Sequence, residues 1–118
     1  MGTIEKKFLS GSTDGKPIPI GNAGDTTRST IHTATDDGID EVWIWATNTA
    51  GSAIDLSIEF GEQGVDHEFR QSITNGNGLN LICQGVPISG TGSVVTAFAA
   101  STSGINLLGF INRIDQQA

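Results

Sequence analysis

The sequence predicts an all-β protein, an antiparallel β-sandwich that is jelly-roll-like and has about eight strands. Runs of strand-forming residues recur roughly every ten residues along the chain, a spacing typical of sandwiches. Apolar residues show no helical period in any segment. The 16 glycines, with many serines and threonines, suit the tight turns between short strands. With 118 residues, the chain is long enough for one core and needs no second domain.

The first part of the chain, residues 1–20, is predicted to be an N-terminal arm or an edge hairpin before a sandwich domain at residues 21–118. Residues 3–10 alternate weakly, and the STDG that follows is a turn. The next run, KPIPI, carries Pro17 and Pro19, which cannot donate ladder hydrogen bonds. This run is therefore an edge strand or an arm laid over a neighbouring subunit.

The strands of the sandwich domain follow in order. Residues 26–35 are rich in β-branched side chains, and a DDG turn ends them. Residues 41–47 and 53–60 are joined by NTAGS, whose length and composition predict an antiparallel hairpin. Residues 65–73 come next, before the turn NGNG. The remaining strands are expected at residues 79–83, 93–100 and 104–114, with a loop at 85–92.

Charge and hydropathy exclude two classes of partner. The formal net charge of -7 has the wrong sign for attraction to nucleic acid phosphates. No segment approaches the ~20 apolar residues of a membrane span, and the N-terminal stretch is charged where a signal peptide needs an apolar core. We therefore expect a soluble protein made in a cytoplasm, with no nucleic acid and no membrane as partner.

Cysteine and histidine usage predicts no metal site. Cys83 is the only cysteine, so no internal disulfide forms, and its apolar neighbours predict a buried, inert thiol. His32 and His67 do not have the spacing of metal ligands, and isolated histidines on strands are usually structural.

The carboxylates predict no catalytic site. The segment DDGIDE is the best candidate for a cation site, but it does not have the register of a calcium-binding loop, so a solvated turn is favoured. Asp14, Asp25 and Asp66 lie in or near predicted loops without a pattern that pairs them as acid and base. We expect no enzyme activity and no cofactor.

Two strands are apolar on both faces, which one core cannot satisfy. Trp43 and Trp45 are two positions apart and so share one face of their strand. Leu108 and Phe110 likewise share one face of the last strand, opposite the face of Leu107. We expect the second face of Trp43 and Trp45, or that of Leu108 and Phe110, to be buried at a subunit interface. The alternative for Trp43 and Trp45 is a platform on which a sugar stacks.

The order of the motifs resembles a known group of proteins. DGKPIPI is followed by TTRSTIHTA, DEVWIWATNTAGSAIDLSIEFG, GLNLICQGVPI, VVTAFAAS and GINLLGFINRI. This order resembles small virion proteins from the structural gene clusters of tailed bacteriophages, in particular capsid decoration or cement proteins. The resemblance implies a small β-sandwich, often trimeric, that sits on the outside of the head and bridges major capsid subunits near local threefold axes.

The resemblance also implies partners and a location for this chain. It predicts a homotrimer bound to the major capsid protein on the capsid exterior, after synthesis in the host cytoplasm. Trp43, Trp45, Leu108 and Phe110 are then expected at the subunit interface, and the arm, including Pro17, Ile18, Pro19 and Ile20, is expected to reach the capsid lattice. The alternatives are a head-fibre or tail component and a carbohydrate- or host-surface-binding module that uses Trp43 and Trp45.

Overall fold

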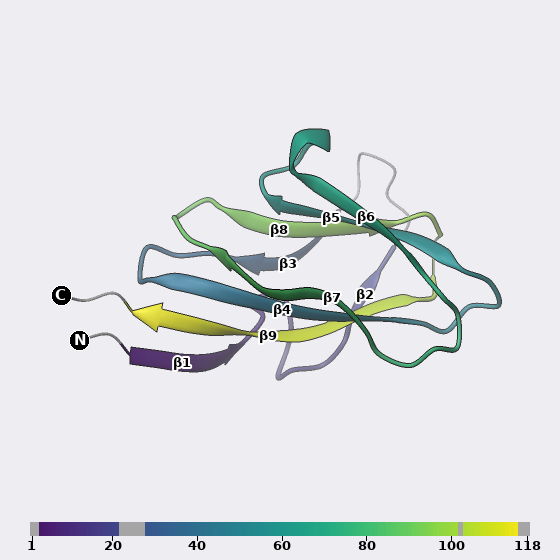
Figure 1. Cartoon of the computed structure of the whole chain (residues 1–118), viewed down its shortest axis with the longest axis horizontal. Helices are drawn as coiled ribbons and strands as arrows, with labels where there is room; N and C mark the ends of the chain where they lie inside the picture. The colour runs from purple at the N-terminus through teal and green to yellow at the C-terminus, as the bar shows by residue number, and fades with distance from the viewer. Residues whose placement is uncertain (1–2, 22–27, 102, 116–118) are drawn as a thin grey trace.

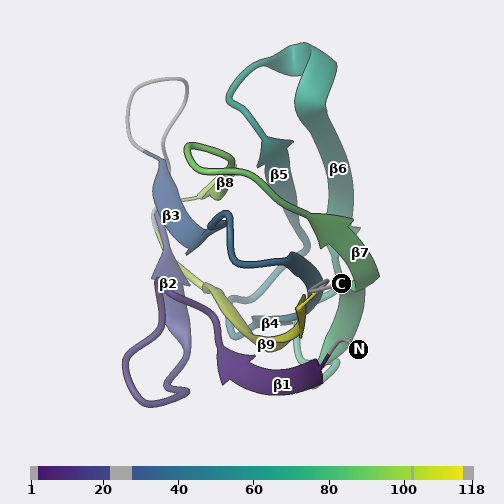
Figure 2. The same ribbon diagram turned by 90° about the vertical axis from the view of Figure 1, so that its left-hand side faces the viewer.

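A computed structural model describes residues 3–21, 28–101 and 103–115, which form nine strands in two antiparallel sheets (Figure 1). Figure 2 shows the two sheets as layers, with sheet A curving along one side of the molecule. Sheet A contains β1 (Thr3–Phe8), β2 (Ile18–Ile20), β4 (Ile39–Asn48), β7 (Asn80–Ile88) and β9 (Ile105–Asp115). Sheet B contains β3 (Ser29–Thr33), β5 (Ile54–Gly61), β6 (Glu68–Ile73) and β8 (Val94–Ala99). The predicted antiparallel sandwich is confirmed; Asp25 and the first two residues of the predicted strand 26–35 lie outside the described residues.

The strand order is that of a jelly roll. Sheet A runs β1-β9-β4-β7, with β2 also paired to β9, and sheet B runs β3-β8-β5-β6. If β1 and β2 are counted as one interrupted edge strand, sheet A holds the first, eighth, third and sixth strands and sheet B the second, seventh, fourth and fifth. This arrangement places strands that are distant in sequence, such as β4 and β9, side by side.

The predicted hairpin between residues 41–47 and 53–60 is wrong, because β4 lies in sheet A and β5 in sheet B. The buried side chain of Asn48 organises the turn that carries the chain across. Its amide nitrogen donates to the carbonyls of Ser52 and Ile73, each at 2.9 Å, and its oxygen accepts from the backbone N–H of Ala50 at 2.9 Å. A loop of this length suits a crossover as well as a hairpin, so its length alone does not decide between them.

Within residues 3–20, β1 and β2 are strands of sheet A that pair with β9. β1 pairs with the second half of β9, from Thr3 opposite Asp115 to Phe8 opposite Phe110. β2 pairs with its first half, from Ile18 opposite Leu107 to Ile20 opposite Ile105. Residues 9–17 loop out between them. β1 and β2 thus follow one another along a single sheet edge, and they do not form a hairpin with each other.

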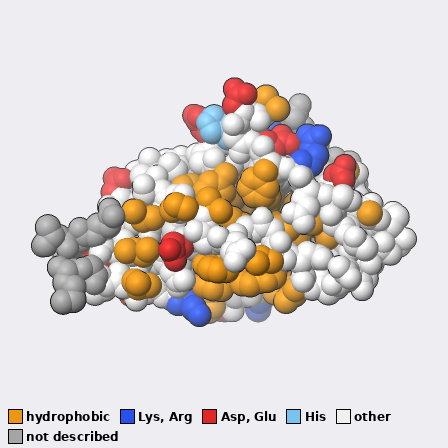
Figure 3. Space-filling model, in the orientation of Figure 1, with side chains coloured by type: hydrophobic (Ala, Val, Ile, Leu, Met, Phe, Trp, Pro, Cys, Tyr) orange, Lys and Arg blue, Asp and Glu red, His pale blue; other side chains and the backbone are white. Residues whose placement is uncertain are grey.

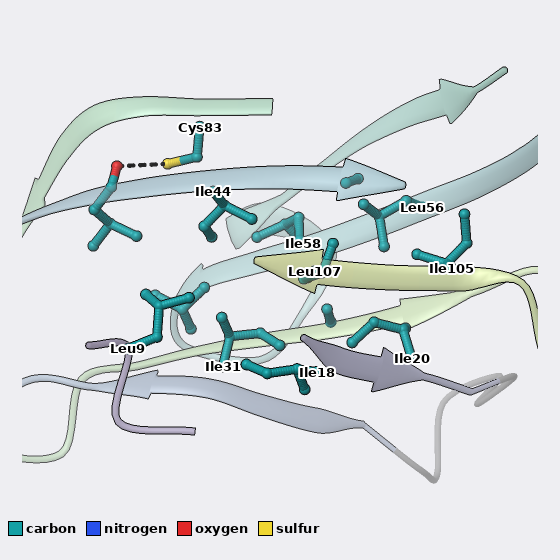
Figure 4. Packing of buried hydrophobic residues seen from close by; sticks show 14 of the residues in the cluster. Leu9, Ile18, Ile20, Ile31, Ile44, Leu56, Ile58, Cys83, Ile105 and Leu107 are labelled. Atoms are coloured by element: carbon teal, nitrogen blue, oxygen red, sulfur yellow. Dashed lines mark hydrogen bonds between the residues drawn. The ribbon is translucent and has the colours of Figure 1, made fainter. Parts of the chain in front are cut away.

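The core fills the space between the sheets, and Figure 4 shows its central residues. Its largest fully buried apolar side chains come from both sheets and from the N-terminal loop: Leu9, Ile20, Ile31, Ile44, Leu56, Ile58, Ile73, Ile105, Leu107 and Ile111. Cys83 is buried as predicted, and its thiol donates to the carbonyl of Val42 at 3.3 Å. Trp43, Trp45, Leu108 and Phe110 are not among the residues of this core.

Two predicted segments differ from the structure by more than a shift of strand ends. The expected strand 65–73 begins with a single 3-10 turn, η1 (Val65–His67), and only then becomes β6. β7 continues into the expected loop as far as Ile88, because its pairing with β4 continues through two shifts in register, one of them at Gly85. Gly85 has a φ of +66°, which glycine adopts at little cost and which lets the strand bulge and continue.

Candidate interaction surface

β4 divides its side chains strictly between two faces. Val42, Ile44 and Ala46 are buried in the core, whereas Trp43 and Trp45 point away from it and are half-buried. This is the period of two that a β-strand imposes. The second apolar face of this strand therefore lies on the outside of sheet A.

β9 lies next to β4 and presents its second apolar face on the same side. Phe110 is directly opposite Trp43, and Leu108 is directly opposite Trp45. Residues directly opposite each other in an antiparallel pair point to the same face of the sheet. The two pairs predicted separately from the sequence are therefore one continuous surface.

Two further strands extend this surface. Phe8 of β1 is opposite Phe110 and is 60% exposed, and Leu81 of β7 is opposite Trp45 and is 40% exposed. We call these six side chains the outer patch: Phe8, Trp43, Trp45, Leu81, Leu108 and Phe110. Figure 3 shows hydrophobic side chains gathered on the side of the molecule where β4, β7 and β9 lie in Figure 1. The outer patch spans all four main strands of sheet A.

The three central rings of the outer patch stack on one another. The centroid of Phe110 lies 5.9 Å from those of Trp43 and Trp45, and the two tryptophan centroids are 6.2 Å apart. The ammonium of Lys6 lies 4.6 Å from the centre of the Phe110 ring, within cation–π range. The indole nitrogen of Trp43 is buried and has no hydrogen-bond partner among the described residues. The three rings thus lie close together with nearly parallel planes.

A groove of about 760 Å³ opens at one side of the outer patch. Phe8, Trp45, Leu108 and Phe110 line it, together with Gly15 from the loop at residues 9–17. It lies where the edge of β9 passes from its pairing with β2 to its pairing with β1. The interruption of the edge strand therefore creates a recess in an otherwise continuous sheet.

The KPIPI segment divides its side chains between core and surface. Ile18 and Ile20 are buried in the molecule's own core, so they are not available as contacts for a partner. Pro17 and Pro19 are exposed. The structure therefore brings Trp43, Trp45, Leu108 and Phe110 together on one surface, but it does not bring the KPIPI residues into that surface.

A buried polar network connects the two sheets at one end of the sandwich. Asp40 accepts hydrogen bonds from Arg113 Nε at 2.8 Å and Nη2 at 3.1 Å, and it lies 2.7 Å from His32 Nε2. Because the Ser10 N–H donates to His32 Nδ1 at 3.0 Å, the ring proton is on Nε2, which donates to Asp40. Burial opposes ionisation of Asp40, but the hydrogen bonds from Arg113 and His32 outweigh it and hold the pKa of Asp40 below its ordinary value.

A second buried carboxylate, Glu59, is satisfied in a similar way. It pairs with the guanidinium of Arg28 and accepts from Thr96 Oγ1 at 3.0 Å and from the Gly64 N–H at 2.7 Å. Burial again opposes ionisation, and these hydrogen bonds again leave the pKa of Glu59 below its ordinary value. Both networks hold the fold together and neither opens onto the outer patch.

The other candidate residues do not converge on a site. In the DDGIDE segment, Asp36 accepts hydrogen bonds from the backbone and side chain of Thr91, which lower its pKa, while Asp40 belongs to the buried network. His67 contacts Glu62 at the exposed end of β5. Within the described residues, no three His, Cys, Asp or Glu side chains are grouped so as to hold a metal ion.

Sequence reasoning missed two members of the outer patch, Phe8 and Leu81. The weak alternation of residues 3–10 was enough to place Phe8 on a strand face, but the partner strand that makes this face outer is β9, more than a hundred residues away. The sequence places Leu81 on a strand, but the face on which its side chain lies depends on the irregular register of β7 against β4.

Comparisons with known proteins give no relative: no family model, no curated protein and no solved structure matches this chain. Among the described residues, no helix is long and apolar enough to span a membrane.

Proposed function

We propose that this chain is a non-enzymatic structural protein of a tailed-bacteriophage virion. In this proposal it decorates the capsid exterior as a homotrimer and bridges subunits of the major capsid protein. The observation that carries the proposal is the outer patch, a largely aromatic surface that lies outside the sandwich core. The order of the sequence motifs, which resembles that of capsid decoration proteins, supports the assignment to the virion.

Association must cover a substantial part of the outer patch to be stable. Each 100 Å² of apolar surface removed from water contributes about 2.5 kcal/mol. Association costs at least about 4 kcal/mol, and several times more in some estimates. A trimer held by this surface therefore needs several hundred square ångströms of apolar contact at each interface, which six large side chains on four adjacent strands can supply.

The geometry of the rings favours a protein partner over a sugar. A sugar stacks on an open ring face, and the ammonium of Lys6 already lies over the Phe110 ring. A protein surface can instead pack against ring edges and fill the groove beside Leu108. We therefore do not propose the carbohydrate-binding alternative.

The test is the position of the chain on purified virus particles. Antibodies against the folded protein should label intact heads, and a particle reconstruction should place its density on the capsid exterior. Particles that lack the protein should release DNA at a lower temperature than complete particles. Absence from particles would overturn the proposal, and label restricted to tails or fibres would overturn the capsid position.

A further inference from the structure

A single row of residues across the outer face of sheet A carries one charge of each sign. Lys6 on β1 is opposite Asn112 on β9, and Asn112 is opposite Glu41 on β4. Glu41 alternates with the buried Val42 and so points outward, as Lys6 does over the ring of Phe110. The row lies directly beside the row that contains Phe8, Phe110 and Trp43.

The two charges do not neutralise each other within one chain. They are separated by two strand spacings, about 10 Å between Cα atoms. The three arginines pair with Glu59, Glu68 and Asp40, but neither Lys6 nor Glu41 forms an ion pair with any described residue. Lys6 is exposed and Glu41 is half-buried at the margin of the outer patch. A partner that covers the outer patch also covers these two charges.

The mixed row favours a particular kind of partner. A contact surface of one sign would satisfy one of the two charges and leave the other covered and unpaired, which is costly. A second copy of this chain carries both signs in the same row. Two copies can be related by a rotation axis that runs parallel to the strands of sheet A. The row of one copy then lies at the same height along the axis as the row of the next, and the β1 side of one copy meets the β4 side of the next.

We infer that the outer patch is covered by a second copy of this chain, placed so that Lys6 of one copy pairs with Glu41 of the next. This rests on the oligomer in the proposed function and deepens it. The pairing explains how a chain with net charge -7 can associate with itself, because the contact region is locally balanced. A rotation axis of this kind gives a closed ring, and the proposed trimer is one such ring.

Charge reversal with rescue tests the inference in solution. The dissociation constant is measured by analytical ultracentrifugation for the wild type, Lys6→Glu, Glu41→Lys and the double variant. Each single reversal should weaken association about tenfold or more, since it places like charges together. The double variant restores opposite charges and the wild-type net charge, so it should return to within about threefold of the wild type. Circular dichroism checks that every variant is folded.

The net charge alone predicts a different pattern, which makes the experiment decisive. Lys6→Glu makes the chain more negative, but Glu41→Lys makes it less negative and would then strengthen association. Glu62→Lys makes the same change of charge on the exposed loop after β5, away from the outer patch, and should not weaken association. A wild type that is monomeric at about 50 µM, or a double variant no better than the singles, would overturn the inference.

These outcomes are independent of the test on virus particles. Labelled capsids with a monomeric protein in solution would contradict the second copy and leave the decoration role standing. Charge rescue in solution with no labelled particles would support the second copy and overturn the decoration role.

Discussion

Removing the carboxylate of Asp40 should strongly destabilise the fold, because three strands depend on it. Asp40 is 1% exposed and lies in β4, Arg113 lies in β9 and His32 lies in β3 of the opposite sheet. In Asp40→Ala, the guanidinium of Arg113 and the Nε2–H of His32 lose their acceptor while they remain largely buried. Breaking a buried charge pair from one side typically costs 3–5 kcal/mol.

The structure places the expected loss at the lower end of that range. The side chain of Arg113 is 16% exposed, so water can partly solvate it after the substitution. We expect the free energy of unfolding to fall by about 3 kcal/mol, against a total of roughly 5–15 kcal/mol for a domain. For a chain of this size, that corresponds to a decrease in Tm of roughly 12 °C.

A double-mutant cycle measures the interaction itself. Urea denaturation gives the free energy of unfolding for Asp40→Ala, for Arg113→Met, which keeps the apolar stem, and for both together. The double variant should lose less than the sum of the singles by about 2 kcal/mol. Losses that add to within about 0.5 kcal/mol would refute the reasoning, because they would mean that Asp40 and Arg113 contribute independently.

The same carboxylate predicts part of the acid sensitivity. Because the pKa of Asp40 is lower in the folded state than in the unfolded chain, its ionisation stabilises the fold above the unfolded value of about 3.9, and this stability is lost as the pH falls through the lower folded value. Asp40→Asn cannot ionise. The difference in free energy of unfolding between wild type and Asp40→Asn should therefore be greatest near neutral pH and shrink below about pH 4.

Three further predictions concern Glu59, Gly85 and Cys83. Glu59→Gln should lower the free energy of unfolding by about 2–3 kcal/mol in urea denaturation, because hydrogen bonds to a buried charge are lost; a loss below about 0.5 kcal/mol would contradict this. Gly85→Ala should lower the melting temperature more than Gly76→Ala does. Both glycines have a φ of +66°, but only at Gly85 would an added Cβ contact the Trp43 ring, at 3.2 Å. Equal melting temperatures of the two variants would argue against that contact. Burial raises the pKa of the Cys83 thiol, so a thiol reagent should label it only in denaturant, and rapid labelling in buffer would disprove its burial.

The period of two was sufficient to predict the faces of the long strands. It places Val42 and Ile44 on one face of their strand and Trp43 and Trp45 on the other face, as in the structure. It likewise places Leu107 and Leu108 on different faces of the last strand. These assignments depend only on the geometry of one strand, so they need no knowledge of its neighbours. The same holds for the burial of Cys83 in its apolar run.

Pairings between distant segments were not predictable in the same way. The crossover after β4 depends on hydrogen bonds from Asn48 to Ser52 and Ile73, and the last of these residues lies 25 positions away. The contact of His32 with Asp40 spans the sandwich, and Arg113 reaches Asp40 from 73 positions along the chain. Single residues with no local pattern carry these contacts, so composition and periodicity do not reveal them.

The adjacency of β4 and β9 is the step that turns two local patterns into one surface. The strand that carries Trp43 and Trp45 is too apolar for a sheet with one face in water, and so is the strand that carries Leu108 and Phe110. The jelly-roll order sets them side by side in register, and the same register aligns Lys6 with Glu41 in the neighbouring row. The apolar residues and the two charges therefore lie in adjacent rows on the same three strands. In the proposed assembly, a second copy of the chain presents both rows at the same spacing.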